Sequence, residues 1–289
     1  MSRYPLSIAA ALALAALTLA GGHASAELIY YLRLDDSALP TAANEVAGQA
    51  DGAYEAFGAS DLQQAPSPGK DSIGSVRFGD LSVAPYQRIL LGQEVVGAKA
   101  LTIALWVNLD AGQLATSKDH ALASLGKWGF PANLLFWRDG ADADGGANGT
   151  LAALVNGSRV NGADEALNTA GWHHVAMTWA ANATDGFRLS VDGVRTKGDR
   201  PAVDVGDEVI GANEGPRDLV LGNKEDAGGE ASKDLVGLLD EVGVWTDALP
   251  ADWIAMLADG THTPATVPEP NTLVLLAVGM LAVLYRLRR

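Results

Sequence analysis

Residues 171–197 read GWHHVAMTWAANATDGFRLSVDGVRTK, and this stretch decides the fold class of the chain. Residues 172–180 and 186–192 form two runs in which apolar side chains recur at every second position. That period is typical of antiparallel strands with one buried face. Asp192-Gly193 then favours a two-residue hairpin turn before Val194, because a type I′ turn needs positive φ at both central positions. The stretch therefore predicts β-sheet.

Similar short runs, separated by turn signals, follow one another along the chain. They predict further strands near residues 73–78, 87–91, 101–109, 120–126, 132–138, 150–155, 218–222 and 235–245. Residues 36–70 have weak periodicity and predict loops with one short strand near residues 54–57. Many short strands without a long amphipathic helix indicate an all-β fold, an antiparallel jelly-roll β-sandwich.

One short helix is expected to close the domain. Asp247 can cap it and Pro250 can occupy its first turn. Its apolar stripe is predicted to be Trp253, Ile254 and Leu257.

The N-terminus has the three parts of an export signal. Arg3 supplies a positive charge, residues 6–19 are apolar, and Ala24-Ser25-Ala26 fits a cleavage site. We interpret residues 1–26 as a secretory signal peptide, with a buried helix as the alternative.

The composition excludes two classes of protein. The chain has no cysteine, which argues against a small domain held by disulfides. Its net charge is −15, and residues 27–267 are more acidic still, which opposes binding to nucleic acid. An acidic surface favours solubility and divalent cations, and solubility alone is enough to explain it.

The C-terminus has an apolar segment followed by a basic end. Residues 267–270 read VPEP, residues 272–285 are almost wholly apolar, and Arg286, Arg288 and Arg289 follow. A helix over the apolar residues would be about 21 Å long, short of a hydrocarbon core of about 30 Å. Its terminal arginines would stay cytoplasmic and leave the domain outside.

Several motifs resemble, in order, the laminin-G-like group of the concanavalin A-like lectin/glucanase superfamily. They are IYYLRLDD at 29–36, SVRF at 75–78, LTIALWV at 101–107, WHHVA at 172–176, VDGV at 191–194, LVLG at 219–222 and GLLDEVGVW at 237–245. The resemblance implies one jelly-roll domain over residues 27–260, followed by a linker over residues 261–271.

The C-terminal pattern is similar to the PEP-CTERM sorting signal of Gram-negative bacteria. The matching residues are Pro268, Glu269 and Pro270, the short transmembrane helix and basic tail over residues 272–289, and within that tail Arg286, Arg288 and Arg289. The resemblance implies an exosortase as partner, transient anchoring in the inner membrane, and final placement at the cell surface or in the extracellular biofilm matrix. An ordinary tail anchor is the alternative.

Asp240 is the most informative single residue. It shares a predicted strand face with the apolar residues Val236, Leu238, Val242 and Val244. A carboxylate on such a face must be paired or bind a metal. In laminarinase-type relatives an Asp of the corresponding last strand holds a structural calcium, so the resemblance implies calcium as a cofactor, with Asp240, Asp35 and Gly52 as ligands. An ion pair with an arginine, or a cap on a loop amide, is the alternative.

Residues 139–148, DGADADGGAN, place Asp and Asn among glycines, as a calcium loop requires. The segment lacks the downstream Glu of an EF-hand, and we interpret it as an acidic hairpin loop, with a second calcium site as the alternative.

Catalytic patterns are missing from the sequence. Retaining β-glucanases of this superfamily carry two glutamates on one strand, and their chemistry needs carboxyl groups about 5 Å apart. Asp240 and Glu241 are neighbours, so alternation predicts that they point to opposite faces. The same argument separates His173 from His174, which we interpret as packed strand histidines. We therefore predict that the protein is not an enzyme.

Aromatic residues offer a candidate binding surface. Trp128 and Trp137 flank a Gly-Phe-Pro turn, and aromatic platforms near polar groups are one way in which lectin-like sandwiches hold sugar rings. The alternative is that both tryptophans fill a sheet face or a loop. The prediction is an exported, non-catalytic surface or matrix protein that binds extracellular polysaccharide or mediates adhesion. A purely structural envelope protein and a glycoside hydrolase are the alternatives.

Overall fold

The stretch that decides the fold class forms the predicted pair of strands and the predicted turn. Strand β11 (His173–Ala180) pairs antiparallel with β12 (Phe187–Val191). Asp192 and Gly193 have φ angles of 50° and 77°, and they turn the chain into β13 (Val194–Thr196). Both central positions therefore have the positive φ that a type I′ turn requires.

A computed structural model describes residues 26–79, 87–114, 118–126, 134–140, 148–163, 165–196, 207–211, 217–223 and 234–267. The first strands are β1 (Leu28–Leu32), β2 (Thr41–Ala42), β3 (Gly52–Glu55), β4 (Val76–Phe78), β5 (Arg88–Leu90) and β6 (Ala100–Leu109). The next are β7 (His120–Leu125), β8 (Leu134–Asp139), β9 (Thr150–Val155) and β10 (Ser158–Asn161), and after β13 come β14 (Leu219–Leu221) and β15 (Gly237–Trp245). The helical turns are η1 (Ala59–Asp61), α2 (Ala111–Leu114), α3 (Ala251–Ala258) and η2 (Pro264–Thr266).

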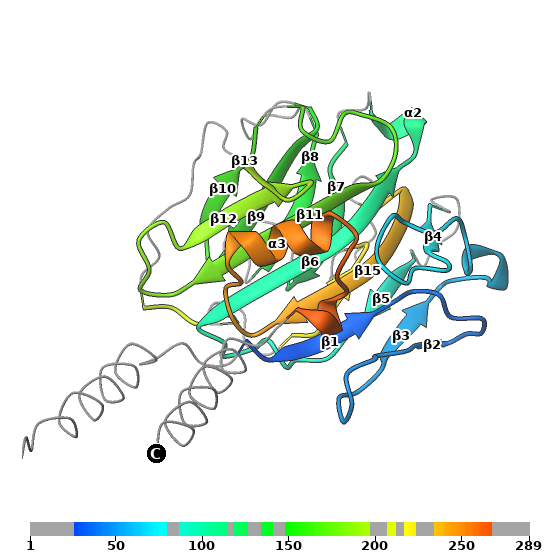
Figure 1. Cartoon of the computed structure of the whole chain (residues 1–289), viewed down its shortest axis with the longest axis horizontal. Helices are drawn as coiled ribbons and strands as arrows, with labels where there is room; N and C mark the ends of the chain where they lie inside the picture. The colour runs from blue at the N-terminus through cyan, green and yellow to red at the C-terminus, as the bar shows by residue number, and fades with distance from the viewer. Residues whose placement is uncertain are drawn as a thin grey trace, which may run out of the picture. The chain divides into compact units, whose positions relative to one another are not determined.

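The strands form two antiparallel sheets that pack face to face (Figure 1). The first sheet has the order β1-β15-β6-β11-β12-β13, and β4 also pairs with β15. The second sheet has the order β10-β9-β8-β7-β14-β5-β3-β2. Neighbouring strands in a sheet are often far apart in sequence, as β6 and β11 are. The predicted all-β sandwich is confirmed.

The core lies between the sheets and follows the period of two. In β6, Leu101, Ile103 and Leu105 are fully buried among core residues. Trp106 of the same strand pairs with Asp240 and His174 on the opposite, outer face. Candidate site residues of the first sheet therefore lie outside the main core.

The predicted strands agree with the observed ones to within about three residues at their ends. The sequence argument missed β2 and β10. Strand β10 pairs with β9 across the turn at Asn156 and Gly157, whose φ angles of 47° and 86° repeat the hairpin signal seen at residues 192–193. That signal was present in the sequence and indicates a second hairpin.

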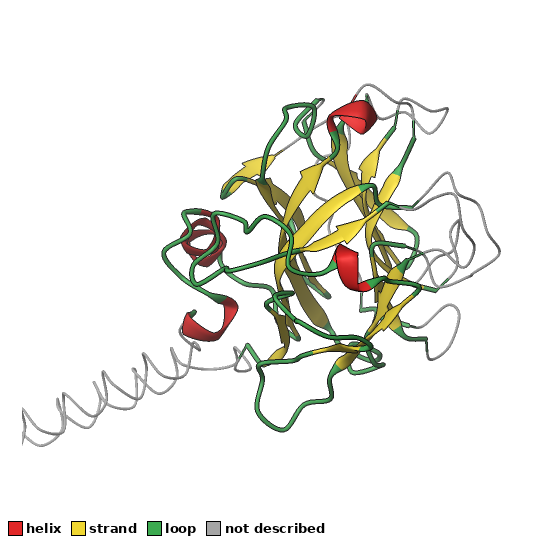
Figure 2. Cartoon of the chain, turned by 90° about the vertical axis from the view of Figure 1, so that its right-hand side faces the viewer, coloured by secondary structure: helices red, strands yellow, loops and turns green. Residues whose placement is uncertain are grey.

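Helix α3 begins later than predicted. Its N-cap is Pro250, and Asp247 does not cap it, because the Asp247 carboxylate accepts a hydrogen bond from the amide of Ala248, 2.7 Å away. Trp253, Ile254 and Leu257 form its buried stripe as predicted. Figure 2 shows α3 on the outer side of the strands, and its contacts are with β11 and β13 of the first sheet.

The compact unit extends to Val267, beyond the predicted boundary at residue 260. Residues 261–267, expected to be part of a linker, include η2, which contacts β1 and β15. Thr263 and Pro264 are buried, and Val267 is 8% exposed. Residues 261–267 of the expected linker therefore pack against the domain, because η2 contacts strands β1 and β15.

The predicted signal peptide, apart from Ala26, and the predicted sorting helix lie outside the described residues. Among the residues that the structure describes, no helix is long and apolar enough to cross a membrane.

Phe136 tests the central core. Its side chain is fully buried in β8, so Phe136→Ala should lower the free energy of unfolding by about 3–5 kcal/mol through lost burial and a cavity. Val194 is 70% exposed, and Val194→Ala should change it by less than about 0.5 kcal/mol. Urea unfolding of both variants provides the measurement, and a similar small effect at both positions would contradict the assigned faces.

Candidate functional site

A β-bulge in β15 places the two candidate carboxylates. The register with β6 shifts between Asp240 and Gly243, and Glu241 has a φ of 48°. An extra residue in a bulge reverses the side-chain alternation beyond it. Consequently Val242 and Val244 lie in the core.

Two predictions about this strand are wrong for the same reason. Asp240 does not share a face with Val242 and Val244, because it pairs with Trp106 on the outer side of the sheet. Asp240 and Glu241 do not point to opposite faces, since Glu241 lies beside Trp106 and Gly69 on that outer side. Side chains alternate with a period of two only while the strand pairing is unbroken, and the bulge interrupts the pairing here.

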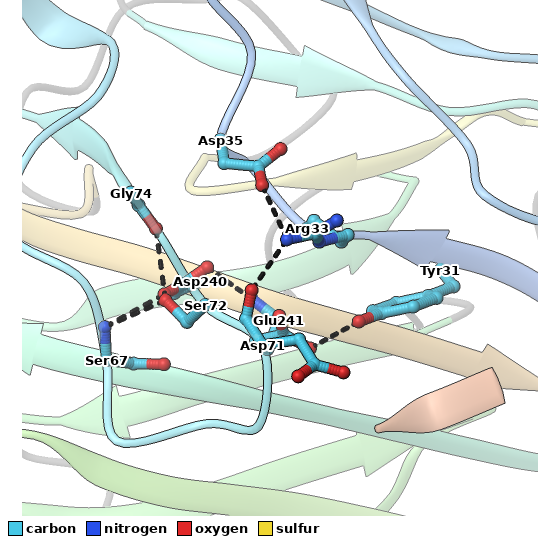
Figure 3. Close-up of polar contacts among 9 residues, drawn as sticks. All are labelled: Tyr31, Arg33, Asp35, Ser67, Asp71, Ser72, Gly74, Asp240 and Glu241. Carbon is cyan, nitrogen blue, oxygen red and sulfur yellow. Dashed lines mark hydrogen bonds and ion pairs between the residues drawn. The ribbon is translucent and has the colours of Figure 1, made fainter. Parts of the chain in front are cut away.

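Asp240 anchors a loop (Figure 3). Its Oδ2 accepts hydrogen bonds from the amide of Ser67, 2.9 Å away, and from the hydroxyl of Ser72. Its Oδ1 accepts the amide of Glu241 at 2.8 Å. Asp240 is fully buried, so these donors replace water around the carboxylate. Of the alternatives left open by the sequence, the structure shows a cap on a loop amide.

The burial of Asp240 raises the pKa of its carboxyl to about 6. The hydrogen bonds from Ser72 and Ser67 act in the opposite direction because they stabilise the charged form. The carboxylate is therefore held in place by donors on loop 65–74, our name for residues 65–74.

Glu241 is the second buried carboxyl. It is 4% exposed, and its Oε2 accepts a hydrogen bond from the hydroxyl of Tyr31 at 2.7 Å. Burial raises its pKa to about 8; the Tyr31 bond and the charge of Arg33 lower it, whereas Asp240 and Asp35 raise it. No donor in the described part of the chain reaches its Oε1.

The other predicted calcium ligands do not join Asp240. Asp35 forms an ion pair with Arg33 at 2.9 Å, and the same guanidinium donates to the carbonyl of Asp71 at 2.6 Å (Figure 3). Gly52 lies in β3 of the second sheet and pairs with Ala42. No group of three or more His, Asp or Glu side chains in the described ranges is arranged to hold a metal. The described residues do not fit a shared calcium shell, and calcium binding stays a prediction.

His173 and His174 have separate environments, as predicted. Nδ1 of His173 lies 2.8 Å from a carboxylate oxygen of Asp192, and its Nε2 lies 2.7 Å from the hydroxyl of Thr169. His174 is 2% exposed and stands edge-to-face against Trp106, with 5.3 Å between ring centroids. Burial lowers the pKa of His174 to about 4, so this imidazole is neutral at physiological pH.

A hollow lies beside Glu241 on the outer side of the first sheet. Its volume is about 10 Å³, which is room for about one water molecule, and it is partly open to solvent. Its lining residues are Gly69, Ala104, Trp106, His174, Glu241, Leu257, His262 and Pro264. Loop 65–74, the strands β6, β11 and β15, helix α3, and the chain at the start of η2 thus all contribute to its wall.

The predicted sugar platform is only partly described. Trp128 lies outside the described residues. Trp137 is 4% exposed and packs with Leu135, Ala152 and Leu154 on the outer face of the second sheet. The guanidinium of Arg159 lies 5.0 Å from the centroid of the Trp137 ring and pairs with Asp139.

Arg138 is a structural residue that the sequence argument missed. It is fully buried and donates hydrogen bonds to the carbonyls of Lys118 and Leu114 and to the side chains of Asn148 and Asn168. It thereby holds both ends of the predicted acidic loop, together with the ion pair of Asp139. Residues 141–147 lie outside the described residues. An Arg inside a strand of apolar residues was the signal available in the sequence.

This geometry defines the protein as a two-sheet sandwich with an outer-face polar cluster covered by a loop. Residues 84–255 match the Laminin_G_3 family of the concanavalin A-like lectin/glucanases superfamily. The match covers more than half of the chain, which therefore belongs to this family. Residues 266–289 match the PEP-CTERM protein-sorting motif, so the chain is an exported protein with a signal for processing at the membrane. No curated protein sequence matches the chain.

Solved structures share the fold at low sequence identity. Domain 4 of AbnA, a GH43 extracellular arabinanase from Geobacillus stearothermophilus in complex with arabinotriose, has a TM-score of 0.50 and 19% identity, over 81% of this chain and all of that domain. The receptor binding domain of botulinum neurotoxin mosaic serotype C/D has a TM-score of 0.54 and 11% identity, over 81% of this chain and 50% of the other. Trypanosoma rangeli sialidase has a TM-score of 0.53 and 14% identity, over 81% of this chain and 33% of the sialidase. These likenesses show the fold alone.

Asp240→Ala tests the two roles of this carboxylate. Without it, the buried donors of Ser67 and Ser72 lose their acceptor, so the free energy of unfolding should fall by about 2–4 kcal/mol. Asp110→Ala breaks the partly exposed pair with Arg77 and should cost less than about 1 kcal/mol. Urea unfolding with calcium and with a chelator provides the measurement.

A calcium ligand would make the wild type, but not Asp240→Ala, more stable in calcium, by RT ln(1 + [L]/Kd). If neither protein responds to calcium, the calcium prediction is wrong. If Asp240→Ala is as stable as the wild type, Asp240 does not anchor the loop.

Glu241 should make the protein less stable as the pH rises. Its pKa is about 8 in the folded state against an ordinary value of 4.5, so the folded state binds more protons between these values. The protonated Glu241 therefore contributes fully to stability below pH 4.5. This contribution is lost as the pH rises from 4.5 through 8. Between pH 6 and pH 8 the free energy of unfolding should fall by about 2 kcal/mol.

Glu241→Gln should remove most of this slope, because glutamine does not titrate. Asp110→Asn, which changes a carboxylate elsewhere, should leave it unchanged. Urea midpoints at pH 6, 7 and 8 measure the effect, and an unchanged slope in Glu241→Gln would contradict the assignment.

Proposed function

We propose that this protein is a non-catalytic module that binds extracellular polysaccharide at the surface or in the biofilm matrix of a Gram-negative bacterium. The observation that carries the proposal is that one chain combines a concanavalin A-like sandwich with a PEP-CTERM sorting motif. The sandwich is the part that remains available outside the cell, so ligand binding is the function that the chain can deliver there.

The end of the fold agrees with processing by an exosortase. The compact unit ends at Val267, directly before Pro268 of the motif. Cleavage anywhere after Val267 would therefore leave both sheets, α3 and η2 intact. In this proposal the segment from Pro268 to the arginines at the C-terminus serves transient anchoring in the inner membrane.

The buried carboxylates support a non-catalytic role. A glycosidase needs two carboxyl groups that face the glycosidic bond. Asp240 is fully buried and occupied by loop donors, and Glu241 is 4% exposed. Loop 65–74 covers Asp240, and Glu241 borders only a small hollow, so the pair does not face a cleft that would hold a sugar chain in the described part of the structure.

We propose that the polysaccharide contacts the outer face of the second sheet. Trp137 with Arg159 combines an aromatic ring and a hydrogen-bond donor, as sugar sites commonly do. The matched domain 4 of the arabinanase was solved in complex with arabinotriose, which supports a saccharide as the class of ligand. We include Trp128 in the proposed sugar-binding surface because it lies close to Trp137 in the sequence.

A purely structural role is the second candidate. The observation that favours it is the low exposure of Trp137, which is 4%. A tryptophan packed against Leu135 and Leu154 stabilises the sheet whether or not a sugar binds. The two functions differ in whether the wild type retains a polysaccharide.

Glycan-array binding and co-sedimentation with extracellular polysaccharide test the proposal. We expect the wild type to bind polysaccharide. Trp128→Ala and Trp137→Ala should each reduce binding about tenfold or more, because the indole ring that contacts the sugar, and its hydrogen bonds, are lost. Trp253→Ala is the matched control, because Trp253 is also nearly buried but lies on α3 over the other sheet.

No binding by the wild type would favour the structural role. Release of sugar from laminarin-type polymers would show instead that the protein is a glycoside hydrolase. Circular dichroism of each variant separates lost binding from lost folding.

A further inference from the structure

Three polar side chains at the start of β11 form a chain of hydrogen bonds that reaches the surface. Oγ1 of Thr169 lies 2.7 Å from Nε2 of His173, and Nδ1 of that imidazole lies 2.8 Å from Oδ2 of Asp192. Thr169 is exposed, and the side chains of His173 and Asp192 are 16% and 52% exposed. A hydroxyl, an imidazole and a carboxylate in this order are the groups with which unrelated folds activate an alcohol.

The carboxylate determines which nitrogen of His173 carries a proton. An ionised carboxylate only accepts hydrogen bonds, so the neutral imidazole has its proton on Nδ1, facing Asp192. Nε2 is then an acceptor, and the hydroxyl of Thr169 is the donor beside it. The carbonyl oxygen of Thr169 lies 3.3 Å from the same Nε2 and can accept a hydrogen bond once this nitrogen gains a proton. The arrangement therefore suits both protonation states of a base that takes the proton of Thr169.

The backbone holds these groups in place. Asp192 begins the turn between β12 and β13, where its amide donates to the carbonyl of His174 at 2.7 Å and its Oδ1 accepts the His174 amide at 2.9 Å. Gly171 has a φ of 114°, a conformation that favours glycine. This glycine lets the chain reverse between Thr169 and His173, so that the hydroxyl meets the imidazole.

A second threonine beside a histidine has the same groups in a different order. The hydroxyl of Thr261 lies 2.8 Å from Nδ1 of His262, and it donates a hydrogen bond to a carboxylate oxygen of Asp259 at 2.6 Å. Here the carboxylate engages the hydroxyl and does not orient the imidazole. Thr261 is exposed, so it serves as an internal control for Thr169.

We propose that Thr169 is a nucleophile that accepts an acyl group from a carboxylic ester. Its Oγ1 forms a bond to the ester carbonyl carbon while its proton passes to Nε2 of His173. The bond between that carbon and the leaving oxygen then breaks, and the imidazolium gives the proton to the leaving alcohol. The products are an acyl-threonine ester and a free alcohol. Asp192 acts as a positioning residue, and the reaction does not depend on polysaccharide binding at Trp137.

The probe is p-nitrophenyl acetate, applied to the exported chain at about pH 8. We expect a burst of about one equivalent of p-nitrophenol and one acetyl group on Thr169, located by peptide mass spectrometry. Thr261 should stay unmodified in the same sample. Thr169→Ser should retain the reaction, whereas Thr169→Val, which has a similar shape and no hydroxyl, should abolish it.

Asp192→Asn separates positioning from folding. Asn-Gly favours the same type I′ turn, and the side-chain oxygen of asparagine can still accept the His174 amide. Its NH₂ group, however, donates toward Nδ1 of His173, so the imidazole proton moves to Nε2, which can no longer accept the proton of Thr169. Acetylation should slow about a hundredfold or more, and the imidazole nitrogen resonances of His173 should show the changed tautomer.

Glucose pentaacetate and glycerol triacetate carry the same acetyl ester on a sugar and on a lipid-type alcohol, and the faster donor identifies the source of the acyl group. Acetylation of Thr169 no greater than that of Thr261, an unchanged burst in Thr169→Val, or an unchanged rate in Asp192→Asn would overturn the proposal.

Discussion

The carboxylate of Asp240 is the interaction on which the outer side of the first sheet depends. It accepts the amide of Ser67, the hydroxyl of Ser72 and the amide of Glu241, and it does so while fully buried. A buried carboxylate without donors would be strongly unfavourable. Loop 65–74 and the carboxylate therefore stabilise each other, since the loop supplies the donors and the sheet supplies the acceptor.

The bulge at Glu241 makes this arrangement possible. By inserting one residue with positive φ, it lets β15 keep Val242 and Val244 in the core while two adjacent carboxyl groups stay outside it. The same bulge brings Glu241 toward Tyr31, Trp106 and the hollow. One local departure from regular pairing thus determines both the loop anchor at Asp240 and the burial that raises the pKa of Glu241.

Regular features of the fold could be predicted from the sequence, and features that depend on irregular backbone could not. Period-two runs located most strands, and Asp192-Gly193 located a turn, because these signals are local. The sequence also singled out Asp240 as a carboxylate that needs partners. It could not show the partners, because Ser67 and Ser72 lie more than 160 residues away in the chain. Nor could alternation reveal a bulge whose left-handed residue is Glu241 rather than glycine.

Asp240 holds loop 65–74 over the outer face of the first sheet, and the proposed non-catalytic role depends on this contact. Amide hydrogen exchange at Ser67, compared with Met177 in the buried strand β11, tests this claim most directly. We expect the Ser67 amide to be protected in the wild type and to exchange rapidly in Asp240→Ala, while the Met177 amide stays protected in both. Rapid exchange at Ser67 in the wild type would show that Asp240 does not hold the loop, because the carboxylate would then be open to solvent.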